Sequence, residues 1–179
     1  MPISAKLRSA STVMAWLSLS GAVVMTIAPP LAFLIPNPMI DLGGRGKFGV
    51  FQDGVTAATP VVWRAAALAA EAVPLALLVF ALVQLFRLFR FYAAGKVFTA
   101  EPVSCLKQIS TAMFWLVPAT VLGDSASQYL LHLPLHQLWV AFKMDMPTWG
   151  LLFLAGVALV ISHVMAEAQK LADENAKFV

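Results

Sequence analysis

The sequence predicts an all-α integral membrane protein: a four-helix bundle with both termini in the cytoplasm. Of its 179 residues, 60% are hydrophobic and only 12% are charged, whereas soluble domains carry about 25% charged residues. Mean hydropathy is +0.83. The charges also leave four long apolar stretches, close to or above the ~20 residues that cross a hydrocarbon core. This composition excludes disorder, fibrous repeats, disulfide scaffolds and most soluble enzymes.

The first apolar stretch, residues 12–35, carries no charge and follows the basic residues Lys6 and Arg8. A cleavable signal peptide has a shorter apolar region of ~7–15 residues that is closed by a small-residue cleavage site. No such site interrupts this stretch, so we expect an uncleaved first span. The adjacent prolines Pro29 and Pro30 are expected to bend or end its helix, because proline lacks the backbone N–H donor.

Three further apolar stretches follow, and the connections between them are short. The third stretch has Asp124 as its sole charge, and the fourth continues into a polar helical tail. The spans lie at about 62–88, 109–131 and 148–164, with a cytoplasmic hairpin at 89–108 and a cytoplasmic tail at 165–179. There is no room for a separate soluble domain, so residues 1–179 form a single membrane domain.

The orientation follows from the basic residues, which gather on the cytoplasmic side of inner-membrane proteins. Counting Lys and Arg on alternate sides of the spans gives eight on one side and four on the other. The eight are Lys6, Arg8, Arg87, Arg90, Lys96, Lys107, Lys170 and Lys177; the four are Arg45, Lys47, Arg64 and Lys143. We therefore expect a multi-pass protein of the bacterial inner membrane, with both termini in the cytoplasm. The scattered cations form no basic stripe, so its partner is the lipid bilayer and not nucleic acid.

Two motifs in the outer connections look functional but lack essential residues. The glycine-rich segment around Gly46 and Lys47 has Asp41 and Phe48 where a phosphate-binding loop needs Gly and Ser or Thr. His132 and His136 have a metal-ligand spacing, but a proline lies between them and no third ligand is near. We therefore predict no metal site, no cofactor and no enzymatic activity.

The inner connection is the most patterned stretch of the chain. Gly95 is placed to end the second helix with a left-handed backbone, and Thr99 to cap the start of the next. The aromatic residues Phe91 and Tyr92 are expected to pack against the floor of the bundle. A tight, ordered hairpin is predicted.

This stretch resembles a family of small bacterial four-helix membrane proteins, the domain-of-unknown-function family 2975. In that family the second span ends in an aromatic and basic segment, followed by Gly, a charged residue, an aliphatic residue, Phe and Ser or Thr. Here the matching residues are Gly95, Lys96, Val97, Phe98 and Thr99. Residues 167–179 are similar to the family's acidic ending. The resemblance implies a membrane protein often encoded beside a small helix-turn-helix regulator, hence a cytosolic partner of that kind, and no known catalytic residues.

The tail admits two interpretations. Glu167 with Lys170, and Asp173 with Lys177, form pairs at helical spacing, opposite an apolar surface. The tail is either a solvated extension of the fourth span or a docking helix for a cytosolic partner.

Glu71 and Asp124 are the two clear cases of an ionisable group inside a span and away from its ends, where a charge costs several kcal/mol. At a rise of ~1.5 Å per residue, both lie about 10 to 12 Å below the outer boundary. If the second and third spans pack as neighbours, the two carboxyl groups face each other and share a proton or bind a cation. Arg64, about two turns above Glu71, competes as its partner. A structural polar network with the serines near Asp124 is the alternative.

Two functions remain from these observations. The first is a non-enzymatic regulator or sensor whose hairpin and tail contact a cytoplasmic partner. The alternative is a small channel or transporter component that uses Glu71 and Asp124 in a polar path.

Overall fold

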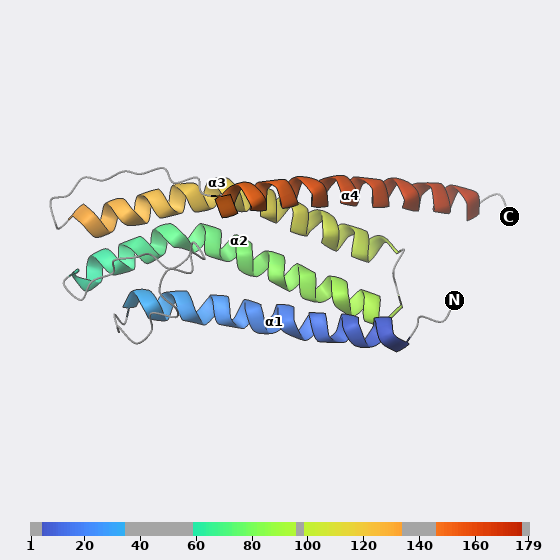
Figure 1. Cartoon of the computed structure of the whole chain (residues 1–179), viewed down its shortest axis with the longest axis horizontal. Coiled ribbons are helices and arrows are strands. Elements are labelled where there is room, and N and C mark those ends of the chain that lie inside the picture. The colour runs from blue at the N-terminus through green and yellow to red at the C-terminus, as the bar shows by residue number, and fades with distance from the viewer. Residues whose placement is uncertain (1–4, 35–58, 96–98, 134–145, 177–179) are drawn as a thin grey trace.

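The described part of the protein folds into four long α-helices (Figure 1). The computed structural model describes residues 5–34, 59–95, 99–133 and 146–176. The helices are α1 (Ala5–Leu34), α2 (Val61–Ala93), α3 (Ala100–His132) and α4 (Met146–Ala176). No strand occurs in these described ranges, and all four helices are long and apolar enough to cross a membrane. The predicted all-α class with four spanning helices is confirmed.

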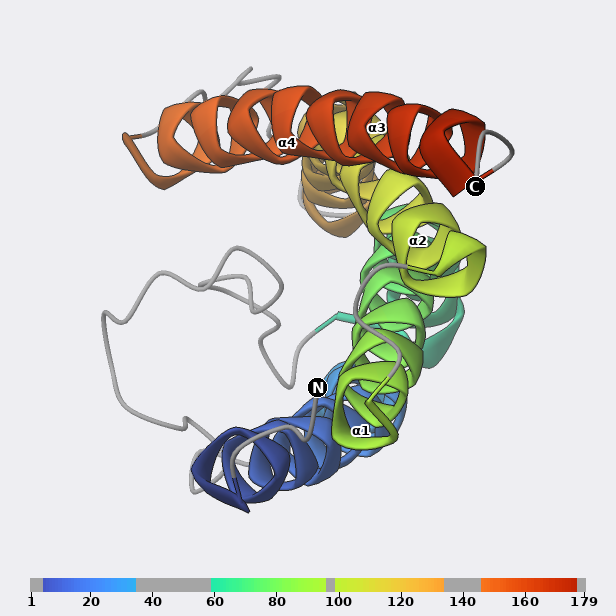
Figure 2. The ribbon, with the colours of Figure 1, turned by 90° about the vertical axis from the view of Figure 1, so that its right-hand side faces the viewer.

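The helices pack in chain order: α1 against α2, α2 against α3, and α3 against α4. Figure 2 shows the result as an open arc, with α1 and α4 at its two ends and α2 and α3 between them. The start of α1, the turn between α2 and α3, and the end of α4 lie at one end of the molecule (Figure 1). This common end is the one for which the basic residues predict a cytoplasmic location.

Helix boundaries differ from the apolar spans in two places. The second helix continues to Ala93 and the third begins at Ala100, and Gly95 adopts φ 87° just after the end of α2. The predicted hairpin at 89–108 is thus mostly helical, since charge marks the membrane boundary and not the end of the helix. In α1 the pair Pro29 and Pro30 does not end the helix, which continues to Leu34.

Small residues form the α1–α2 interface. Ala15, Ser18 and Ala22 recur every three or four residues and are buried, and a Cβ on Gly21 would lie 3.8 Å from Leu82 of α2. Small side chains let membrane helices approach closely, and close approach is the main source of attraction between helices in lipid. The interface therefore rests on backbone proximity.

The α2–α3 interface combines apolar packing at both ends with polar groups between. At one end Ala67 packs with Leu131. At the other, Leu88, Cys105 and Ile109 form a cluster against which Phe91 and Tyr92 pack, among other residues. The expected packing of these aromatic residues against the bundle floor is therefore present. This interface holds both polar sites described below.

Candidate functional site

A buried polar cluster joins α2 to α3 in the half of the interface predicted to face outward. We call Glu71, Asp124 and Ser127 the carboxyl cluster. The Ser127 hydroxyl donates a hydrogen bond to Glu71 Oε1 at 2.9 Å. Glu71 is 4% exposed and Ser127 is fully buried. A carboxyl group from one helix is thus held by a hydroxyl group from the next, without solvent contact.

Asp124 lies beside this pair, less than one turn before Ser127 on α3. The Ser127 hydroxyl is 3.2 Å from the Asp124 carbonyl oxygen, and the Asp124 carboxyl group is close enough to Glu71 to interact electrostatically with it. The structure therefore brings together the two intramembrane carboxyl groups singled out from the sequence. Two carboxyl groups so placed in a low dielectric can share a proton or bind a cation, and the same groups with Ser127 can also serve as a structural polar network that joins α2 to α3.

Close contact between the helix backbones makes this cluster possible. A Cβ atom on Gly123 would lie 3.1 Å from Pro74 Cγ and 3.3 Å from both the Ala70 carbonyl oxygen and Glu71 Oε2. Only glycine fits there without displacing a neighbour. Pro74 has no N–H with which to bond the Ala70 carbonyl four residues earlier. That carbonyl faces Gly123 and adds a polar oxygen next to the carboxyl cluster.

Arg64 is buried at the start of α2, above the carboxyl cluster. Its Nε donates a hydrogen bond to the Thr59 carbonyl oxygen at 2.8 Å, and Thr59 itself is 2% exposed. This bond ties the guanidinium to the segment that enters α2. Arg64 thus anchors the start of the helix through Nε.

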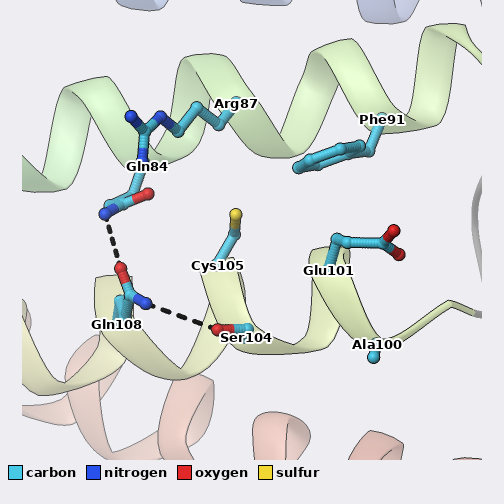
Figure 3. Close-up of a pocket in the computed structure, with 8 residues that line it drawn as sticks. All are labelled: Gln84, Arg87, Phe91, Ala100, Glu101, Ser104, Cys105 and Gln108. Carbon is cyan, nitrogen blue, oxygen red and sulfur yellow. Dashed lines mark hydrogen bonds between the residues drawn. The ribbon is translucent and has the colours of Figure 1, made fainter.

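A second polar group, which sequence reasoning missed, bridges α2 and α3 near the other end of the interface. Gln84 Nε2 donates to Gln108 Oε1, and Gln108 Nε2 donates to Ser104 Oγ at 3.3 Å. These groups line a groove of about 480 Å³ with Arg87, Phe91 and Glu101, shown in Figure 3. We call it the inner groove. The signal in the sequence is a pair of glutamines near the inner ends of two consecutive apolar stretches, Gln84 inside the second and Gln108 just before the third.

The turn that carries the family motif ends α2 as the sequence predicts, but the side-chain cap expected at the start of α3 is not formed. The Ala94 and Gly95 N–H groups donate to the carbonyl oxygens of Arg90 and Tyr92 at 3.0 and 3.1 Å. Thr99 occupies the N-cap of α3 with an extended backbone, although its side chain forms no capping hydrogen bond. Lys96, Val97 and Phe98 lie outside the described residues.

The end of α4 is the other candidate surface. Figure 1 shows α4 displaced along the bundle axis and projecting past the start of α3. Lys170 Nζ lies 3.5 Å from Glu167 Oε2, and both side chains are about two thirds exposed, at 71% and 67%. The predicted Asp173–Lys177 pair cannot be assigned, because the Asp173 side chain and Lys177 lie outside the described residues. The same holds for the His132 side chain and His136. In the described ranges, no three His, Cys, Asp or Glu residues gather to hold a metal ion.

Four apolar helices packed in series, with polar contacts along one internal interface, define a multi-pass membrane protein. The family model described as Protein of unknown function (DUF2975) matches residues 11–179. The chain belongs to this family, as its resemblance predicted. Neither the curated proteins nor the solved structures contain a match to the chain.

Proposed function

We propose that this chain is a non-enzymatic regulator or sensor of the bacterial inner membrane that acts through a cytoplasmic partner. The projection of α4 beyond the start of α3 supports this function (Figure 1). A helix needed only to span the membrane gains nothing from this extension. Near the end of α4 the side chains of Glu167 and Lys170 are exposed, and Leu171 is 55% exposed.

The surface suits a helical protein partner. An exposed leucine beside a charged pair provides the apolar anchor and polar rim that protein interfaces combine. The α2–α3 turn lies at the same end of the molecule (Figure 1), so one partner can contact both elements. The resemblance to the family implies that this partner is a cytosolic helix-turn-helix regulator. If the chain holds this regulator at the membrane, less of the regulator is available to bind DNA.

Photo-crosslinking in living cells tests this function. A photoreactive amino acid is placed at Leu171, and at Val62 as the matched control. Val62 is 76% exposed and starts α2, at the opposite end of the molecule. We expect a covalent adduct with a soluble DNA-binding protein from position 171 and none from position 62. Identical adducts from both positions, or adducts with membrane proteins alone, would contradict the proposal.

Deletion provides the second measurement. Removal of residues 168–179 together with substitution of residues 95–99 is expected to release the same soluble protein from purified membranes. If the membranes keep that partner after both changes, the cytoplasmic surface has no part in its binding.

A small channel or transporter component is the second candidate function. The carboxyl cluster favours it, because Glu71 and Asp124 lie together beside the proline-freed Ala70 carbonyl. Oxygen atoms of this kind form intramembrane sites for protons or Na⁺. Glu71→Gln with Asp124→Asn is then expected to abolish proton or Na⁺ flux into proteoliposomes while the folded protein persists. Absence of flux in the unmodified protein would eliminate this candidate.

A further inference from the structure

The inner groove lies at the level of lipid headgroups. Arg64 and Arg87 are 23 residues apart on α2, which corresponds to about 34 Å along a helix. A hydrocarbon core is about 30 Å thick. The two arginines therefore mark its two surfaces, and the groove beside Arg87 opens at the inner one, by the orientation that the basic residues predict.

One end of the groove is rich in hydrogen-bond donors. Figure 3 shows the Arg87 guanidinium directed toward Gln84. Gln84 and Gln108 each use one amide N–H in the contacts that join them to Gln108 and Ser104. Each primary amide has two N–H donors, and the Ser104 hydroxyl, which accepts one bond, still has its own O–H to donate. A guanidinium with these donors is the chemistry that binds a phosphate group.

The other end has the opposite character. Glu101, in the first turn of α3, and Phe91, near the end of α2, line it together. A carboxylate attracts an ammonium group, and the face of an aromatic ring adds a cation–π attraction. The groove thus has a cationic, donor-rich end and an anionic, aromatic end.

We infer that the inner groove binds a zwitterion that carries a phosphate group and an ammonium group, of the phosphoethanolamine type. The phosphate lies against Arg87 and the two glutamines, and the ammonium against Glu101 and Phe91. A phosphatidylethanolamine headgroup of the inner leaflet has this chemistry, and so does soluble O-phosphoethanolamine. The inference is independent of the proposed partner, because it uses only groups inside the groove.

Native mass spectrometry of the purified full-length chain tests the binding. Phosphatidylethanolamine is compared with phosphatidylglycerol of the same acyl chains, which has the phosphate but lacks the ammonium. We expect the unmodified chain to retain phosphatidylethanolamine about tenfold better. Glu101→Gln should remove this preference, whereas Arg87→Gln should weaken retention of both lipids by about tenfold, the effect of one charge-assisted hydrogen bond. Arg87→Lys should restore part of the loss.

Arg90→Ala is the matched control, because Arg90 lies one turn further along α2, where its guanidinium stacks over Phe86 at 5.7 Å, outside the groove. It should retain both lipids as the unmodified chain does. Equal retention of the two lipids by the unmodified chain, or an equal loss from Arg90→Ala and Arg87→Gln, would overturn the inference. Displacement of bound lipid by millimolar O-phosphoethanolamine would identify a soluble zwitterion as the ligand. Retention of the lipid would identify the membrane itself as the source.

Discussion

Replacing Gly123 with alanine tests the contact on which the carboxyl cluster depends. The added Cβ would lie 3.1 Å from Pro74 Cγ and 3.3 Å from the Ala70 carbonyl oxygen, whereas carbon atoms pack best at about 3.5–4.0 Å. Neither neighbour is the end of a flexible chain. The helices must therefore separate by roughly half an ångström, and overpacking of this kind typically costs about 1–3 kcal/mol. The gain in helix propensity from Gly to Ala, about 1 kcal/mol, offsets part of this cost.

Gly156→Ala is the control that separates the two terms. Gly156 is also helical, but a Cβ placed there meets nothing within 4 Å, so the substitution contributes only the propensity gain. The free energy of unfolding is measured for both variants in mixed micelles, by tryptophan fluorescence during denaturant titration. We expect Gly123→Ala to be less stable than Gly156→Ala by about 1–3 kcal/mol. Equal stability, or a more stable Gly123→Ala, would refute the close-contact argument.

Three further predictions concern single positions. Ser127→Ala removes the buried hydrogen bond to Glu71 and should lower the free energy of unfolding by about 1 kcal/mol, as interhelical bonds in lipid do; no measurable change would show that the bond contributes nothing. Gly95→Ala forces a Cβ into a backbone with φ 87° and should cost about 1–2 kcal/mol in the same titration; an unchanged or raised stability would contradict the strain. In a chain without its native cysteine, Glu167→Cys should react with a membrane-impermeant thiol reagent only from the cytoplasmic side, and Val62→Cys only from the outside; the reverse pattern would invert the predicted topology.

The sequence was sufficient for the number of helices and for the level of the carboxyl cluster. Charge is so costly in hydrocarbon that spans appear in the sequence as long stretches with few charged residues. Counting residues from the ends of those spans then placed Glu71 and Asp124 at the same depth. Gly95 was identifiable as the end of α2 because glycine adopts a left-handed backbone without steric cost.

Rotation of each helix about its own axis could not be predicted. Lipid tails are as apolar as leucine, so hydropathy does not say which side of a span faces a neighbour. Ser127 was visible near Asp124 in the sequence, but its bond to Glu71 depends on how α2 and α3 turn toward each other. The pairing of Gln84 with Gln108 and the contact at Gly123 depend on the same rotation. The open arc also depends on helix rotation, because its shape is set by the face of α2 that packs against α1 and the face of α3 that packs against α4.

The packing of the helices in chain order has a consequence for biogenesis. Each main interface joins elements that leave the ribosome one after the other, so every helix after α1 finds a packing neighbour already made. The α2–α3 hairpin can assemble first, α1 can then pack against α2, and α4 is added last. No helix needs a partner that is far from it in the sequence. The helix α1 therefore does not need to be covalently joined to α2 in order to pack against it. A separately synthesised α1 would present its own row of small residues to the same face of α2 and complete the protein in trans.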